Sequence, residues 1–214
     1  NLFHGAELFN LKLKGAYEAL SQQYSKLRSS QEYSIETSLR FPKFLLPILE
    51  KEQFVKKYNP KTSLSAAYNY QNLPFYTRTI ANATFGYNWN SGDYSSHIVN
   101  PFQLNVVKLD TIDPEFLKKI QTSPYIRNSY RDIIILGGNY SYTFSNQSIK
   151  KSKDFWFVRF NAETAGNMLG LTGKLSGWKK DNDAYEILGQ RFAQYFRTDI
   201  DMRYNVIFND VSSI

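Results

Sequence analysis

The sequence predicts an all-β protein, an antiparallel transmembrane β-barrel with about eight strands present. Three observations support this fold class. Apolar and polar residues alternate along most of the chain, the alternating runs are long, and the composition is unusual. Aromatic residues make up 16 % of the chain while the mean hydropathy is only −0.46. Strands with one apolar and one polar face combine these two properties.

Successive side chains of a strand point to opposite faces, so alternation marks a two-faced strand. In the first run, Phe9, Leu11 and Leu13 share one parity, whereas Asn10, Lys12 and Lys14 share the other. Seven further runs follow the same rule, although the fifth is less regular and mainly β-branched. The expected strands cover residues 6–20, 32–41, 62–72, 75–90, 97–109, 130–146, 154–166 and 192–208.

The length of these runs favours a membrane barrel over a soluble sandwich. Most runs are roughly 10–17 residues long, whereas strands of globular proteins are usually about 5–6 residues long. A strand tilted near 45° needs about 9–11 residues to cross the hydrocarbon layer. Five aromatic residues near the ends of the runs are expected to form a girdle at the headgroup level. They are Tyr87, Trp89, Tyr140, Tyr142 and Tyr204.

The connections between the runs alternate in length. The turns at 91–96 and 146–152 are short and would lie on one side, while 110–129 and 167–190 are long and would lie on the other. Short periplasmic turns and long outer loops are usual in outer-membrane barrels. The segment 43–60 is a long exception, in which 48–58 could form a short helix. A second short helix is expected from Pro114 to Ile120, with Asp113 as its N-cap.

Composition narrows the function. The chain has 214 residues, no cysteine and two histidines, so neither a disulfide framework nor a metal site is expected. The net charge is +7, but the basic residues are scattered rather than clustered, which argues against a nucleic-acid partner. No apolar stretch reaches 18 residues, so no membrane-spanning helix is expected. No signal peptide is recognised at Asn1. No cofactor is implied.

Three groups of polar or small residues were considered for chemistry. Ser95, Ser96 and His97 with Asp93 are sequence neighbours and are interpreted as a polar turn, because a catalytic triad draws on separated segments. Asp199 and Asp201 share a strand face with Arg197 and Arg203, which predicts a ladder of ion pairs. Gly137 and Gly138 lie inside a strand run, where glycine marks a bend or a close approach. The chain is therefore not expected to be an enzyme.

Several segments, taken in order, resemble the BamA/TamA superfamily of outer-membrane assembly factors, most closely its Bacteroidetes-type members. They are NLFHGAE at 1–7, RFPKFLLP at 40–47, HIVNPFQL at 97–104, PYIRNSYRD at 124–132, NYSYTF at 139–144, ETAGN at 163–167 and QYFRTDID at 194–201. Each segment is a weak match alone, and their order makes the resemblance more specific. His4 departs from it, since the family has arginine there.

The resemblance implies that residues 1–214 are the N-terminal part of a barrel of about 16 strands. The periplasmic POTRA domains, the later half of the barrel with its inward-loop motif, and the terminal aromatic strand would then lie outside the chain. The family inserts or translocates proteins at a lateral gate, where the first strand templates an incoming strand. The implied partners are nascent outer-membrane proteins and outer-membrane lipids, with assembly lipoproteins or an inner-membrane protein as further candidates.

The lateral gate would be the strand at residues 6–20. The residues expected to bind the substrate strand are Leu8, Asn10, Lys12, Lys14, Gly15 and Ala16. Gly15 and Ala16 are expected to interrupt the strand and to weaken its pairing. Two alternatives stay open. The chain could form a complete eight-stranded outer-membrane barrel that acts as a pore, an adhesin or a lipid-modifying protein, or it could form a soluble lipid-binding barrel.

Overall fold

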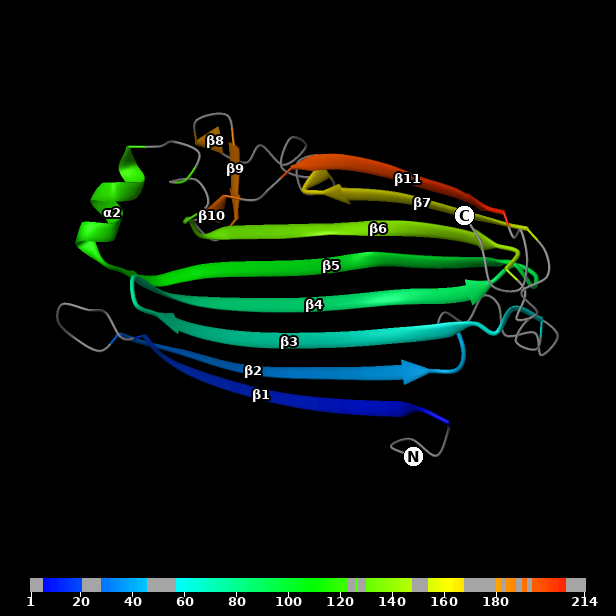
Figure 1. The fold of residues 1–214 in the computed structure, drawn as a ribbon, viewed down its shortest axis with the longest axis horizontal. Helices are drawn as coiled ribbons and strands as arrows, with labels where there is room; N and C mark the ends of the chain where they lie inside the picture. The colour runs from blue at the N-terminus through cyan, green and yellow to red at the C-terminus, as the bar shows by residue number, and fades with distance from the viewer. Residues whose placement is uncertain are drawn as a thin grey trace.

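The computed structural model describes residues 6–20, 28–45, 57–122, 126, 130–147, 154–167, 180–181, 184–187, 190–191 and 194–206. Its main element is an eight-stranded antiparallel sheet in which neighbours along the chain are neighbours in space (Figure 1). The strand order is β1-β2-β3-β4-β5-β6-β7-β11. Consecutive antiparallel strands can be joined by simple hairpin connections, so the order follows directly from the chain.

The strands of the sheet are 11 to 18 residues long. They are β1 (Leu8–Leu20), β2 (Arg28–Phe41), β3 (Lys61–Leu73), β4 (Tyr76–Asn90), β5 (Ser95–Ile112), β6 (Ile133–Ser145), β7 (Phe155–Ala165) and β11 (Tyr195–Asn205). All eight predicted strands are confirmed. β2 begins four residues before the predicted start at 32, and β5 extends beyond the predicted 97–109 at both ends because its ladder continues to Asn90 of β4 and to Tyr76.

The helix predicted after Asp113 is confirmed as α2 (Pro114–Gln121). The Asp113 carboxylate accepts hydrogen bonds from the backbone N–H groups of Glu115, at 2.9 Å, and Phe116, at 3.1 Å. These are two of the N–H groups that a helix leaves without an internal partner. The helix predicted at 48–58 lies mostly outside the described residues, although Lys57 and Tyr58 at its end are helical.

A small second sheet was not predicted. Within the expected loop at 167–190 and just after it, β8 (Lys180–Asp181), β9 (Ala184–Ile187) and β10 (Gln190–Arg191) pair in the order β10-β9-β8. This sheet lies beside the ends of β6 and β7 (Figure 1). Its strands are too short to show alternation in the sequence.

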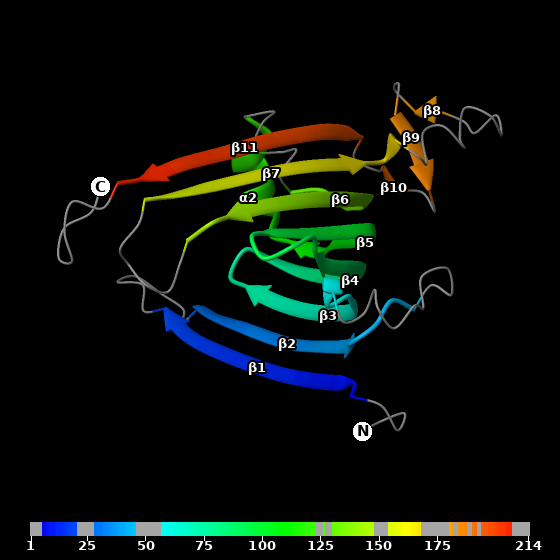
Figure 2. The same cartoon turned by 90° about the vertical axis from the view of Figure 1, so that its right-hand side faces the viewer.

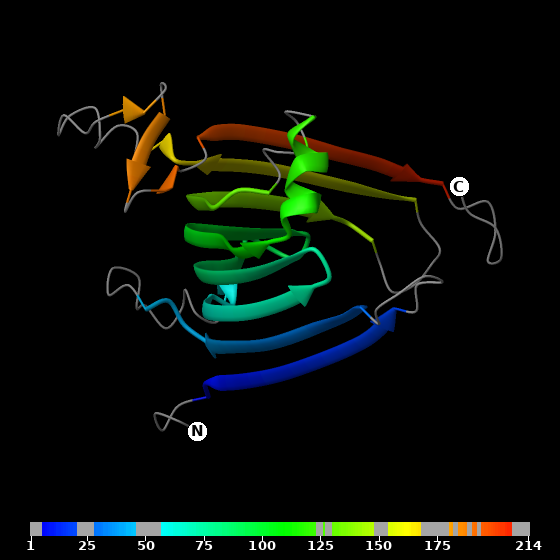
Figure 3. The same ribbon diagram turned by 90° about the vertical axis from the view of Figure 1, so that its left-hand side faces the viewer.

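The eight-stranded sheet is curved but not closed (Figures 2 and 3). Among the described residues, β1 pairs only with β2, and β11 pairs only with β7. The two strands lie at opposite ends of the sheet. The structure therefore confirms the all-β antiparallel architecture, with two open edges. No helix of the described residues is long and apolar enough to cross a membrane.

The ladder from β1 to β3 keeps one register over its full length. β1 and β2 pair without a break from Leu8 opposite Arg40 to Leu20 opposite Arg28, and Gly15 lies opposite Tyr33. The prediction that Gly15 and Ala16 interrupt the strand is therefore wrong. Pairing depends on backbone N–H and C=O groups, which glycine and alanine supply as well as any other residue.

The register shifts where β5 meets its neighbours. Asn100 of β5 pairs with Asn139 of β6, and the next pair is Gln103 with Gly137, so β5 contains a bulge around Pro101. Proline lacks an N–H group and is tolerated within a sheet at such a bulge. A Cβ on Gly138 would lie 2.7 Å from the carbonyl oxygen of Asn100, and one on Gly137 would overlap the Thr164 carbonyl. The close approach predicted for this glycine pair is confirmed.

We predict that Gly137→Ala weakens the packing of β6 against β7. The added Cβ meets backbone atoms that cannot rotate away, so the free energy of unfolding should fall by about 1–3 kcal/mol. Gly15→Ala is the matched control, because the nearest atom to its Cβ is Cδ1 of Tyr33 at an ordinary 3.9 Å. Urea titrations followed by tryptophan fluorescence compare the two variants. Equal stability of Gly137→Ala and Gly15→Ala would contradict the close approach.

Candidate functional site: an open strand edge between two faces

The predicted site residues all lie on β1 at the open edge of the sheet. Leu8, Asn10, Lys12, Lys14, Gly15 and Ala16 are exposed. Leu8, Asn10, Lys12, Lys14 and Ala16 share one parity, and therefore one face, whereas Gly15 belongs to the other. The structure thus brings five of the six residues into one row along the edge strand.

We call the face that carries Lys12 and Lys14 the polar face. In register, it presents mainly charged, amide and hydroxyl side chains on β1 to β4. The Lys14 ammonium lies 2.6 Å from Oε1 of Glu36, and the Lys12 ammonium lies 3.7 Å from Oε2 of the same carboxylate. Glu36 of β2 therefore sits between two lysines of β1. This contact between neighbouring strands was not predicted, because the sequence alone does not give the register.

Further along the polar face, amides replace lysines as partners of a carboxylate. The Glu32 carboxylate accepts hydrogen bonds from the amides of Asn69, at 2.6 Å, and Gln71, at 3.2 Å. The Gln71 side-chain oxygen in turn accepts two hydrogen bonds from the Arg78 guanidinium. The result is a chain of polar contacts across β2, β3 and β4. Beside it lies a hollow of about 230 Å³, lined mainly by polar-face residues of β1 to β4.

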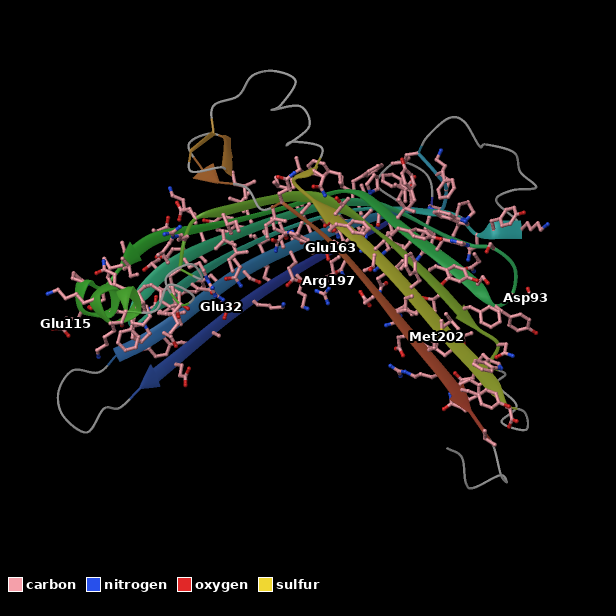
Figure 4. All side chains as sticks on the ribbon, turned by 90° about the horizontal axis from the view of Figure 1, so that it is seen from above. Glu32, Asp93, Glu115, Glu163, Arg197 and Met202 are labelled. Carbon is pink, nitrogen blue, oxygen red and sulfur yellow. The ribbon has the colours of Figure 1, made fainter. Side chains whose placement is uncertain are left out.

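The polar face continues at the other end of the sheet. Glu163 of β7 lies opposite Arg197 of β11, and the two are close together in Figure 4. The Arg203 guanidinium contacts Asp201 two residues away at 2.6 Å, while Asp199 accepts a hydrogen bond from the Asn161 amide at 2.8 Å. The predicted ion-pair ladder is thus confirmed at Asp201, whereas an amide is the partner of Asp199.

The opposite side, the apolar face, is continuous across all eight strands. One row of paired residues runs from Leu13 through Ile35, Tyr68, Ala81 and Val106 to Ile134. A second runs from Tyr142 through Phe160 to Ile200. Many of these side chains are open to the surroundings, and Leu13 and Phe196 are each 69 % exposed. Apolar area of this extent is unusual on a monomeric protein in water.

Aromatic residues gather near both ends of the strands, on the apolar face beside the β4–β5 turn and, at Tyr76, on the polar face at the other end. Beside the β4–β5 turn, the rings of Trp89 and His97 stack with centroids 5.0 Å apart. Trp156 and Tyr204 lie 4.5 Å apart at the same end. At the other end, α2 places Phe116 against three rings, those of Phe75, Tyr76 and Tyr130. Figure 4 shows these ends, with Asp93 at the turn and Glu115 on α2.

The segment after β2 closes over one end of the apolar face. Phe44 packs edge-on against Tyr87 and Trp89, with ring centroids 5.2 and 5.8 Å apart. The fully buried Thr62 holds this segment in place, since its hydroxyl accepts from Leu45 N–H and donates to the Lys43 carbonyl. The sequence showed no signal for this arrangement, because Phe44 lies outside the alternating runs.

A groove of about 680 Å³ lies on the apolar face around the β5 bulge. Gly138 and Pro101 line it, and it extends over Leu136, Tyr140 and Ala162 to Phe196 on β11. Pro101 was a visible signal for an irregularity in β5, although the groove itself depends on the register.

The residues considered for catalysis are not arranged as a triad. The two ring nitrogens of His97 contact the hydroxyl oxygens of Ser91, at 2.7 Å, and Tyr140, at 2.9 Å. The Ser95 hydroxyl instead contacts Tyr142 at 3.2 Å. In the described ranges, no three histidine or acidic side chains are grouped as metal ligands would be.

Comparison with known proteins adds no relative. No family model, no curated protein and no solved structure matches the chain.

We predict that Glu36→Lys loosens the pairing of β1 with β2. The change places three cations on neighbouring positions, so amide hydrogen exchange in β1 should become several-fold faster. Glu36→Gln should have a smaller effect because it removes the attraction without adding repulsion. The double variant Lys14→Glu/Glu36→Lys restores one opposite-charge pair and should recover part of the protection. Identical exchange in all three variants would contradict the role of Glu36.

Proposed function

We propose that this chain forms part of the wall of a transmembrane β-barrel in the bacterial outer membrane. We further propose that the open edge of β1 pairs with strands of nascent outer-membrane proteins during their insertion or translocation. The observation that carries the proposal is the position of β1, an exposed strand that ends a sheet with one apolar and one polar face. An unpaired strand edge is a template for β-augmentation.

The dimensions and faces of the sheet support a location in the membrane. Its strands have 11 to 18 residues, and about 9–11 residues suffice to cross the hydrocarbon layer when tilted. Lipid chains would cover the apolar face, from Leu13 on β1 to Ile200 on β11. Aromatic rings at both strand ends fit the headgroup level. The polar face would line the interior, where Lys14 and Glu36 remain hydrated.

Two further facts favour an assembly role over other barrel functions. The segments that resemble the BamA/TamA superfamily follow the order of that family's barrel strands. In addition, β1 and β11 are at opposite ends of an open sheet, which disfavours a complete small barrel closed by those two strands. A soluble lipid-binding barrel would need the apolar face turned inward. Extraction that requires no detergent would favour that alternative.

We predict that β1 crosslinks to substrate strands. The chain has no cysteine, so single replacements such as Asn10→Cys and Ala16→Cys introduce unique thiols. Bacteria that assemble an outer-membrane protein with single cysteines in its terminal strand should yield disulfide adducts at β1. Asn82→Cys on the polar face of β4 is the control, because that strand is paired on both sides. Adducts at Asn82→Cys but at no position of β1 would refute the proposed edge.

A further inference from the structure

Two lysines of the edge strand share one carboxylate of the neighbouring strand. Lys12 and Lys14 share the single carboxylate of Glu36, and only Lys14 is in close contact with it. Their side chains remain 56 % and 51 % exposed. Among the described residues, no other carboxylate lies within ion-pair distance of either ammonium group. The two ammonium groups therefore have one carboxylate in direct contact between them.

The other neighbouring carboxylates are not in direct contact with these two lysines. Glu32 accepts hydrogen bonds from two amides of β3, and Glu18 accepts one from the Ser30 hydroxyl. Glu32 lies on β2 and Glu18 lies further along β1, so neither is on the open side of Lys12. A strand added at the edge is the element that would reach Lys12 and Lys14 from that side. Residues directly opposite across an antiparallel pair have Cβ atoms about 4.5–5.5 Å apart.

We propose that the strand accepted by β1 carries two carboxylates, two residues apart, opposite Lys12 and Lys14. This inference rests on the proposed function and defines the chemistry of its substrate strand. Because side chains alternate with a period of two, both carboxylates face the polar side together. The residues that flank and separate them are apolar and lie opposite Leu11 and Leu13, which are 52 % and 69 % exposed.

The alternation also fixes the register of the incoming strand. A slip by one residue would move both carboxylates to the apolar face, next to lipid, where an unpaired charge is costly. The two charge pairs thus select one parity. A slip by two residues keeps the parity but leaves one lysine unmatched. Charge and alternation together discriminate between registers that backbone pairing alone treats as equal.

This chain contains a strand of the required pattern. In β11, Asp199 and Asp201 alternate with Thr198, Ile200 and Met202. β11 shows that the pattern is compatible with an antiparallel strand in such a sheet. It also makes β11 of a second copy the competing occupant of the edge, which the experiment must separate from an incoming strand.

The test uses the full chain, folded in lipid nanodiscs, with Tyr17→Cys as its single thiol. The probe is a synthetic peptide that copies Tyr195–Asn205 with Phe196→Cys. When Asp201 of the peptide lies opposite Lys12 and Asp199 opposite Lys14, the peptide thiol lies opposite position 17. A second peptide has Asn in place of both aspartates. We expect the acidic peptide to form the disulfide about fivefold faster at low ionic strength, and the difference to shrink with added salt.

Variants of the edge separate charge from shape. Lys12→Gln/Lys14→Gln should remove the difference between the peptides, and Lys12→Glu/Lys14→Glu should reverse it. Equal rates for both peptides on the unaltered lysines would overturn the acidic preference and leave the templating function intact. No adduct with either peptide, together with no crosslink to a nascent protein, would reject the templating function itself. A disulfide-independent dimer that blocks the peptide would assign the edge to a second copy and overturn the inference.

Discussion

The antiparallel ladder from β1 to β11 is the constraint on which the rest of the structure depends. Because side chains alternate along each strand, the register of every pair decides which residues share a face. A shift of one residue at β1–β2 would carry Leu13 to the polar face and Lys14 to the apolar face. At the bulge around Pro101, β5 has one residue more than β6. Beyond the bulge, the side chains of β5 again lie on the same faces as the β6 side chains opposite them.

Alternation is local, which is why the sequence predicted the strands well. The eight strands and the Asp113 cap of α2 depend on residues close together in the chain. The contact of Glu36 with two lysines, the cover formed by Phe44 and Thr62, and the groove at Gly138 depend on register between separate segments. The prediction for Gly15 is wrong because backbone groups hold the ladder together, and a glycine supplies them as well as a larger residue does. The strands β8 to β10 are too short for alternation to be visible.

The two faces and the edge are parts of one arrangement. The apolar face suits contact with lipid, aromatic rings gather at both strand ends, and in the proposed barrel the polar face would keep Lys12, Lys14 and Glu36 in an aqueous environment. Side chains of β1 lie on both faces of the sheet, so a strand that pairs with β1 must place suitable side chains on both faces. Charge opposite the lysines and apolar side chains opposite Leu11 and Leu13 are two aspects of that match. The open edge therefore has a side-chain specificity in addition to its backbone groups.

In the proposed barrel, the sheet stands in a bilayer with lipid on one face only. Spin labels placed one at a time on cysteines from Phe9 to Ala19 of β1, in lipid nanodiscs, measure this directly through collisions with oxygen and with a water-soluble nickel complex. We expect oxygen accessibility to peak at Phe9, Leu11, Leu13 and Tyr17, and nickel accessibility to peak at Asn10, Lys12 and Lys14. Uniformly high nickel accessibility along the strand, without a period of two, would contradict the claim.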